Sequence, residues 1–257
     1  MNKLLARTLL AATALALCHP VYAAEKLRIA TEGAYPPFNE LLPDGSLAGF
    51  DVDIAKAICA DMKVECEFVK QDWDGLIPGL LAKKFDLIAA SMTITDERKK
   101  KVDFTAKYYQ TPSQFSAKKG SGLDVTPEGL KGKSIGVQRG TIHACYIEKL
   151  FGGSDVKLYP SQQEAFADLM AGRVDVAFSD TVGATEQLLK PAGGQNYELV
   201  GSAQKDPACL GEGVGIALRK DNGELRDRLS KAIKDIREDG TYEKINTKYF
   251  TFDIYGD

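Results

Sequence analysis

The chain has 257 residues, and its 33 basic and 36 acidic side chains give a formal net charge of −3 at pH 7. A chain of this length forms one large domain or two small ones. The small negative charge argues against nucleic acid or an anionic membrane as a partner, because both attract basic surfaces.

Residues 1–23 are typical of a secretion signal. Lys3 and Arg7 give a positive start, and the apolar run at 9–17 is too short to span a bilayer. We expect cleavage after Ala23, which removes two positive charges and no acids, so the net charge changes from −3 to −5. Cys18 leaves a lipoprotein as an alternative, although the leucine before it is bulky for a lipid-attachment site. No later apolar run reaches the length of a membrane helix.

The expected mature chain retains Cys59, Cys66, Cys145 and Cys209. An even number of cysteines in an exported protein favours disulfides over free thiols or a metal site. Only one histidine, His143, remains, so a zinc site or a Ser-His-Asp triad has little to draw on. We therefore expect neither a metal nor a cofactor.

The first half of the chain alternates between strand and helix patterns. Residues 26–38 predict a strand that runs into a glycine-containing loop, and residues 64–69 alternate as a second strand. Apolar residues at helical spacing predict a helix over 51–62, with Asp51 as its N-cap. A further helix is expected over 74–82.

Two pairs of segments resemble each other. LLAKKFDLIAAS (80–91) matches LMAGRVDVAFSD (169–180), and KLRIATEGAYPPF (26–38) matches GKSIGVQRGTIHA (132–144). The duplication predicts two α/β units built alike, each presenting strand ends and loops to a common place.

The second half continues the same alternation. A helix is expected over 162–171, and residues 224–250 read as two amphipathic helices divided at Gly240. Strands that alternate with helices predict parallel sheets with helices on both faces, and ligands bind at the carboxyl ends of such strands. No linker rich in Pro, Gly or Ser separates the two units, so crossing strands are expected to join them. The predicted strand ends carry Glu32, Ser91, Gln138, Ser179 and Asp180.

Seven segments together carry a family resemblance. They are IATEGAYPPF, GFDVDIAKAIC, DWDGLIPGL, DLIAASMTITDERKKKVDF, GKSIGVQRGT, AGRVDVAFSD and DGTYEKINTKYF. From about Lys26 to Asp257, the chain resembles bacterial extracellular solute-binding proteins for polar amino acids, above all the periplasmic lysine/arginine/ornithine- and histidine-binding proteins of ABC importers. No single motif is decisive, but their order and spacing are specific.

The resemblance implies an α/β fold, the two-lobed periplasmic-binding-protein fold of type II. Each lobe would be a mixed sheet flanked by helices, and two crossing hinge strands would join the lobes. Lobe I would comprise residues 24–110 and 212–257, and lobe II residues 111–211 with the hinge segments. A monomeric periplasmic protein would then bind a free L-amino acid in the cleft and deliver it to an ABC permease.

A bound amino acid needs partners for both of its charged backbone groups. By resemblance, Arg98 clamps the carboxylate, and its fork suits two parallel hydrogen bonds. Thr93 adds a donor, as do the backbone N–H groups of Thr141 and Ile142 at a helix start. Asp180 matches the acid that binds the ammonium, although it could instead be a helix N-cap.

Side-chain selectivity is expected from Glu32, Tyr35, Trp73 and Gln138. Glu32 suits a distal cation, and the two aromatic rings suit a guanidinium stem. Arginine is favoured, with lysine, ornithine and histidine behind it. The remaining expected ligand-binding residues are Ser91, which could accept a bond from the ammonium, together with Ala90, Met92 and His143.

Three positions depart from the basic-amino-acid binders. Ala90 stands where several relatives have a second Ser, His143 stands where Gln is common, and Glu32 replaces a shorter Asp. Glutamine or an opine therefore remains an alternative ligand. An enzyme similar to cyclohexadienyl dehydratase, with Glu32 as an acid of raised pKa, is the less favoured alternative.

The pairs Cys59–Cys66 and Cys145–Cys209 are the expected disulfides. The family often has a bridge at the first pair, which closes a short loop. The second pair would tie the helix after GTIH to the turn-rich segment KDPACLGEG. Two separate buried thiols remain the alternative for Cys145 and Cys209.

Overall fold

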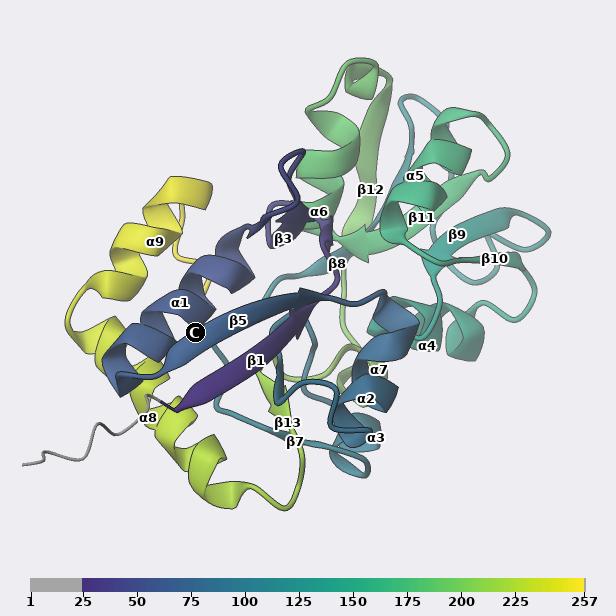
Figure 1. The fold of residues 1–257 in the computed structure, drawn as a ribbon. Helices are drawn as coiled ribbons and strands as arrows, with labels where there is room; N and C mark the ends of the chain where they lie inside the picture. The colour runs from purple at the N-terminus through teal and green to yellow at the C-terminus, as the bar shows by residue number, and fades with distance from the viewer. Residues whose placement is uncertain (1–24, 257) are drawn as a thin grey trace, which may run out of the picture.

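A computed structural model describes residues 25–256 of the protein (Figure 1). The predicted secretion signal and its cleavage site lie outside the described residues. Within the described part of the chain, no helix is both long and apolar enough to cross a membrane.

Two five-stranded sheets share one plan. The first has the strand order β5-β1-β6-β13-β7, and the second has the order β10-β9-β11-β8-β12. In each sheet three parallel strands are followed by a strand that runs antiparallel to them. The strands of the first sheet are β1 (Lys26–Thr31), β5 (Glu65–Lys70), β6 (Leu87–Ile88), β7 (Asp103–Phe104) and β13 (Ala217–Leu218). Those of the second are β8 (Ser113–Lys118), β9 (Ser134–Gln138), β10 (Asp155–Tyr159), β11 (Val176–Asp180) and β12 (Tyr197–Gln204).

The shared plan agrees with the two similar units expected from the repeated segments. The strand–helix alternation predicted parallel sheets, and that prediction is incomplete, because β13 and β8 enter their sheets antiparallel after the chain crosses between the units. Strand alternation could not show this, since the pairing joins segments far apart in the sequence. The mixed sheets implied by the family resemblance are confirmed. A separate three-stranded sheet contains β2 (Ala34–Tyr35), β3 (Asn39–Leu41) and β4 (Leu47–Ala48).

Two crossing segments connect the sheets. One runs from β7 to β8 and the other from β12 to β13. They pair with each other through an antiparallel bridge between Tyr109 and Val214, and the N–H of Tyr108 donates to the Val214 carbonyl at 2.8 Å. The connection is therefore a pair of hydrogen-bonded segments and not a flexible linker.

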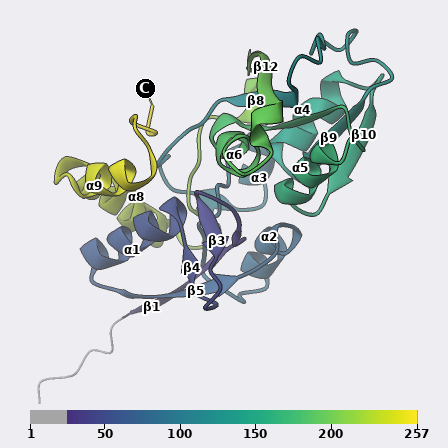
Figure 2. The same cartoon turned by 90° about the horizontal axis from the view of Figure 1, so that it is seen from above.

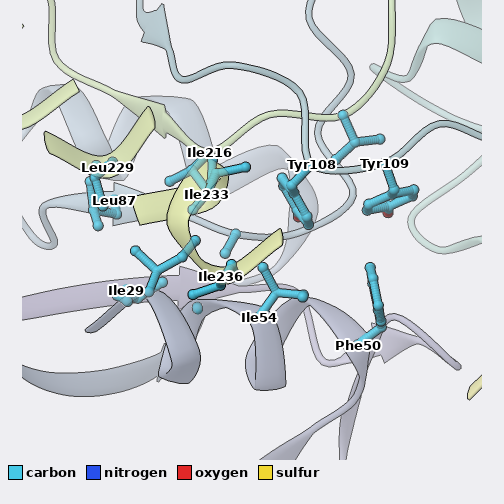
Figure 3. Close-up of a cluster of buried hydrophobic side chains, with 14 of the residues drawn as sticks. Ile29, Phe50, Ile54, Leu87, Tyr108, Tyr109, Ile216, Leu229, Ile233 and Ile236 are labelled. Atoms are coloured by element: carbon cyan, nitrogen blue, oxygen red, sulfur yellow. The ribbon is translucent and has the colours of Figure 1, made fainter. Parts of the chain in front are cut away.

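Helices cover both faces of the first sheet. Alternate residues of its strands point to opposite faces, so Ile29 packs with α1, α8 and α9, while Ala30 packs with α2. Figure 3 shows the first of these cores, where Ile54 and Ile233 meet Ile29. Figure 2 shows α1, α8 and α9 together on one side of the sheet. The bounds are α1 (Phe50–Met62), α2 (Trp73–Leu81), α3 (Asp96–Lys99), α8 (Gly223–Glu238) and α9 (Thr241–Tyr249).

The second sheet is covered in the same way. Phe115 and Phe178 pack with Tyr146 of α4 on one face, and Ala177 packs with Phe166 of α5 on the other. The bounds are α4 (Ile142–Leu150), α5 (Gln162–Met170), α6 (Thr181–Ala184) and α7 (Pro207–Leu210). Between α6 and α7 lie a π-helical turn at Thr185–Leu189 and a 3-10 turn at Gly194–Asn196.

Most predicted helices are present within a residue or two, but one helix start differs. The two C-terminal helices divide at Gly240, whose φ of 81° ends one and begins the other. The expected N-cap at Asp51 is wrong, because α1 begins at Phe50 with Gly49 as its N-cap. Gly49 has a φ of 118°, and a Cβ there would lie 2.4 Å from the Phe38 carbonyl oxygen. Asp51 is instead turned into the protein interior.

Candidate functional site

A pocket lies between the two sheets and is lined by residues of both units. Of the thirteen residues expected to bind a ligand, the structure brings twelve together around this pocket. Met92 is the exception, because it is 1% exposed and packs in the core beneath α2. The lining residues are Glu32, Tyr35, Trp73, Ala90, Ser91, Thr93 and Arg98 from the first unit, with Gln138, Thr141, Ile142, His143 and Asp180 from the second.

Arg98 presents a partly buried cation to this pocket. It lies in the short helix α3, where the Thr95 hydroxyl caps its backbone N–H. The guanidinium donates to the carbonyls of Thr93 at 2.8 Å and Gly140 at 3.4 Å, and it lies 5.3 Å from the Trp73 ring centroid. Burial lowers the Arg98 pKa to about 10, so the group stays charged at neutral pH.

Arg98 differs from its lysine neighbours in its partners. No acid among residues 25–256 forms an ion pair with Arg98, whereas exposed Lys99 and Lys100 pair with Asp96 and Glu97 on the surface. The lysines therefore form a solvated face, while the arginine charge is left for an anion in the pocket.

Asp180 faces the pocket at the carboxyl end of β11. Its carboxylate accepts hydrogen bonds from the Tyr35 hydroxyl at 2.8 Å and from the Thr111 hydroxyl. It occupies the N-cap position of α6, but its side chain makes no capping bond there. The helix-cap alternative therefore does not account for the position of this side chain.

His143 lies beside Asp180, with its Nε2 atom 3.9 Å from the carboxylate and 3.1 Å from the Ser113 hydroxyl. Burial lowers the pKa of His143 from its ordinary value of 6.5, with the nearby Asp180 charge opposing that shift. The imidazole is therefore neutral at pH 7 and leaves the negative charge of Asp180 for a cation.

Glu32 supplies a second acid to the pocket lining. It is 5% exposed, and its carboxylate accepts a hydrogen bond of 2.7 Å from the Gln138 amide. Burial raises the pKa of Glu32 to about 7, against the opposing effect of that hydrogen bond. Among the described residues, no Lys, Arg or His forms an ion pair with Glu32.

The first turn of α4 adds donors beside Arg98. The Thr141 hydroxyl accepts from the Ala144 N–H and donates to the Gln138 carbonyl. The N–H groups that begin a helix have no intrahelical acceptor, so those of Ile142 and His143 remain as donors where these residues line the pocket.

Several contacts close the pocket across the gap between the sheets. Besides the Tyr35–Asp180 and Glu32–Gln138 hydrogen bonds, Arg139 forms an ion pair with Asp74. Asp74 lies inside the first turn of α2, where Asp72 holds the N-cap position without a side-chain bond.

Residues 27–252 match the sequence profile of the bacterial extracellular solute-binding proteins, family 3. The chain belongs to this family. An L-arginine-binding protein of Pseudomonas aeruginosa is 49% identical over 259 residues, which cover 100% of this chain and 99% of that protein. A lysine/arginine/ornithine-binding periplasmic protein of Escherichia coli is 41% identical over 235 residues, covering 91% of this chain and 90% of that protein.

A solved structure of an ancestral arginine-binding protein bound to glutamine is also similar. It shares 38% identity and has a TM-score of 0.81, covering 90% of this chain and all of that chain. These similarities confirm the family resemblance seen in the sequence. Together with the two mixed sheets flanked by helices, they also confirm the type II periplasmic-binding-protein fold.

Sequence reasoning missed one residue beside the pocket, Asp51. Asp51 lies directly behind Ser91, and its carboxylate accepts from both the N–H and the hydroxyl of Ser91. The available signal was its position on the apolar stripe of α1, in register with Ile54, Ala55 and Ile58. An acid on a buried stripe must have internal partners.

Proposed function

We propose that the protein captures a cationic L-amino acid between two lobes and delivers it to the permease of an ABC importer. Arginine is the favoured ligand, with lysine, ornithine and histidine as further candidates. The lobes would comprise residues 24–110 with 212–257, and residues 111–211. After cleavage behind Ala23, the protein would act as a periplasmic monomer. The family and the names of its relatives support this proposal.

The observation that carries the proposal is a set of three charged side chains in the pocket lining. Glu32 is buried, Arg98 and Asp180 are partly buried, and none of the three has a charged partner at neutral pH among residues 25–256. Arg98 supplies one positive charge, while Asp180 and Glu32 supply two negative charges when both are ionised. A free arginine carries the complementary set, with one carboxylate, one ammonium and one guanidinium. Burying charges is favourable only when they are paired, so such a ligand compensates all three at once.

The ligand orientation follows from the same charges. The carboxylate would lie at Arg98 with Thr93 and the start of α4, and the ammonium at Asp180 with Ser91. The side chain would then pass Tyr35 and Trp73 towards Glu32 and Gln138. A guanidinium stacked on an aromatic ring gains about 0.5–2 kcal/mol per contact.

Glutamine, an opine and an enzymatic substrate fit this charge pattern less well. Glutamine has no distal cation and would leave ionised Glu32 without a partner. An opine offers a substituted amine where Asp180 and Ser91 suit a free ammonium. We also infer that the protein is not an enzyme, because prephenate has no ammonium for Asp180, and the compared relatives are named as binding proteins.

Calorimetric titration of the mature protein, stripped of ligand by unfolding and refolding, tests the proposal. The panel contains arginine, lysine, ornithine, histidine, glutamine, octopine and prephenate. We expect one arginine per chain and tighter binding of cationic amino acids than of glutamine. Absence of heat with every cationic amino acid, or a preference for prephenate with its turnover, would contradict the proposal.

A further inference from the structure

Asp51 lies behind the wall of the pocket, outside the residues that line it. Its Oδ2 atom accepts hydrogen bonds from the Ser91 N–H at 2.8 Å, the Ser91 hydroxyl at 3.0 Å and the Asn39 amide at 2.9 Å. Its Oδ1 atom accepts from the Tyr108 hydroxyl at 2.6 Å. The residue is 0% exposed, so these bonds are made away from water.

The backbone of Ser91 needs such a partner. Ser91 follows β6 and has a φ of 51°, in the left-handed region that residues with a Cβ rarely adopt. Such conformations persist only where surrounding contacts impose them. The two bonds from Ser91 to one oxygen of Asp51 impose this turn directly, and they place Ser91 in the pocket lining.

The same contact decides whether the Ser91 hydroxyl donates or accepts a hydrogen bond on the pocket side. A serine hydroxyl has one proton to donate and two lone pairs that accept. The proton is donated to Asp51, so the Ser91 oxygen can only accept a hydrogen bond from a group in the pocket. An acceptor suits a ligand ammonium and disfavours a carboxylate.

We propose that Asp51 is a positioning residue for the ligand: it fixes the left-handed turn of Ser91 and makes the Ser91 hydroxyl an acceptor for the ligand's ammonium. This inference rests on the proposed amino-acid-binding function. Tyr108 lies on the first crossing segment, and its N–H is bonded to Val214 on the second. The hydrogen bond from the Tyr108 hydroxyl to Asp51 therefore connects this wall of the pocket to both crossing segments.

Two substitutions separate hydrogen bonding from charge. Asp51→Ala removes every acceptor, and we expect it to weaken arginine binding by about tenfold or more. Asp51→Asn can keep its oxygen towards Ser91 and Asn39 while its NH₂ donates to the Tyr108 hydroxyl, so a loss of about threefold or less is expected.

Asp53→Ala is the matched control on the same helix. The Asp53 carboxylate bonds Tyr249 and Lys248 near the surface, away from Ser91, so its loss should change affinity by about twofold or less. Losses from Asp51→Asn as large as those from Asp51→Ala would overturn positioning by hydrogen bonds.

A double-mutant cycle with Ser91→Gly tests whether Asp51 affects arginine affinity through Ser91. Glycine adopts a φ of 51° without a Cβ penalty and has no hydroxyl to orient. In the Ser91→Gly background, Asp51→Ala should therefore cost about threefold or less in arginine affinity. An equal loss in both backgrounds would show that Asp51 acts as a general structural residue, and the proposal would fail.

Hydrogen exchange of the Ser91 amide in the ligand-free wild-type protein requires neither a variant nor a bound ligand. We expect the Ser91 N–H to exchange far more slowly than the N–H of exposed Gly122. Fast exchange at Ser91 would overturn the positioning role even if Asp51→Ala does not fold. Failure of the wild type to bind any cationic amino acid would instead contradict the proposed function, while the exchange result would still stand.

Discussion

The guanidinium of Arg98 is surrounded by backbone carbonyls and an indole ring, whereas most arginines near the surface of this protein meet a carboxylate. Its charge is therefore compensated only by dipoles, which suits a group that exchanges its partner each time a ligand binds and leaves. Lys100, two residues later, is exposed and paired with Glu97. Both residues stand in one basic run of the sequence, where the family resemblance singled out Arg98, and the structure distinguishes them by exposure and by partner.

Arg98→Ala should therefore weaken arginine binding much more than Lys100→Ala. Removing one member of a buried charge pair costs about 2–5 kcal/mol, because the other charge stays buried and unpaired. The loss of an exposed lysine should cost about 0.5 kcal/mol or less. Titration calorimetry on both variants measures the difference, and equal losses would show that the carboxylate binds elsewhere.

Affinity for arginine should depend on pH through Glu32. Its pKa in the ligand-free protein is raised to about 7 by burial, and a guanidinium binds the ionised form. Affinity should therefore be highest above pH 7 and decline below it, by at most about tenfold per pH unit, because the carboxylate must first lose a proton.

Titrations between pH 5.5 and 8.5 on the wild type and Glu32→Gln test this dependence. The variant should bind arginine more weakly at pH 8 and lose the dependence near pH 7. The pKa of His143 is lowered from 6.5, so its effect should appear only at more acidic pH. A wild-type affinity that is flat across this range would contradict the role of Glu32.

Most of the pocket lining was predicted from the family resemblance, together with the charged and aromatic residues at the predicted strand ends. Two residues were misplaced. Met92 was named among the ligand-binding residues, but its side chain packs in the core beneath α2. Asp51 was treated as a helix cap because an acid near a helix start is the usual N-cap pattern, and only the fold brings Ser91 against it.

At the scale of the elements, two disulfides join neighbouring segments of the fold. In the structure Cys59 is bonded to Cys66 and Cys145 to Cys209, which are the pairs favoured from the sequence. The first joins the end of α1 to β5. The second joins α4, whose first turn lines the pocket, to α7 on the second crossing segment.

The two bridges should differ in their contribution to stability. On the chain-entropy model, closing 64 residues between Cys145 and Cys209 stabilises by about 4 kcal/mol, and closing 7 residues at the other bridge by about 2 kcal/mol. Denaturant unfolding of the Cys145→Ala/Cys209→Ala and Cys59→Ala/Cys66→Ala pairs compares them. Non-reduced peptide mapping checks the pairing itself, and free thiol at Cys145 or Cys209 in exported protein would contradict it.

Helix positions were well predicted because their signals are local, namely the apolar spacing and the glycine that divides α8 from α9. The strand partners were not predictable in the same way. β13 lies between β6 and β7 although more than a hundred residues separate it from either. In the second sheet, β8 lies in the corresponding place, between β11 and β12. The pairing therefore depends on the crossing segments, which only the complete fold reveals.

At the scale of the whole molecule, the pocket exists because two similar units meet face to face. The Tyr35–Asp180 and Glu32–Gln138 hydrogen bonds and the Asp74–Arg139 ion pair all join one unit to the other. Two of these contacts involve proposed ligand-binding carboxylates, so ligand binding and approach of the units should be coupled.

Ligand binding should therefore make the protein more compact and alter the fluorescence of Trp73, the only tryptophan. Trp73 lies against both Arg98 and Gly140, which belong to opposite units. Small-angle scattering and fluorescence titration with arginine measure the two effects. Identical scattering with and without saturating ligand would indicate a rigid site.

Arg139→Ala should weaken binding by only about 1 kcal/mol or less, because its ion pair with Asp74 is about half exposed.

A crystal structure of the protein with L-arginine tests the central claim most directly. The account predicts one arginine between the units, with its carboxylate on Arg98, its ammonium on Asp180 and Ser91, and its guanidinium beside Glu32. An arginine bound in the reverse orientation, or bound outside this pocket with Arg98 and Asp180 untouched, would contradict it.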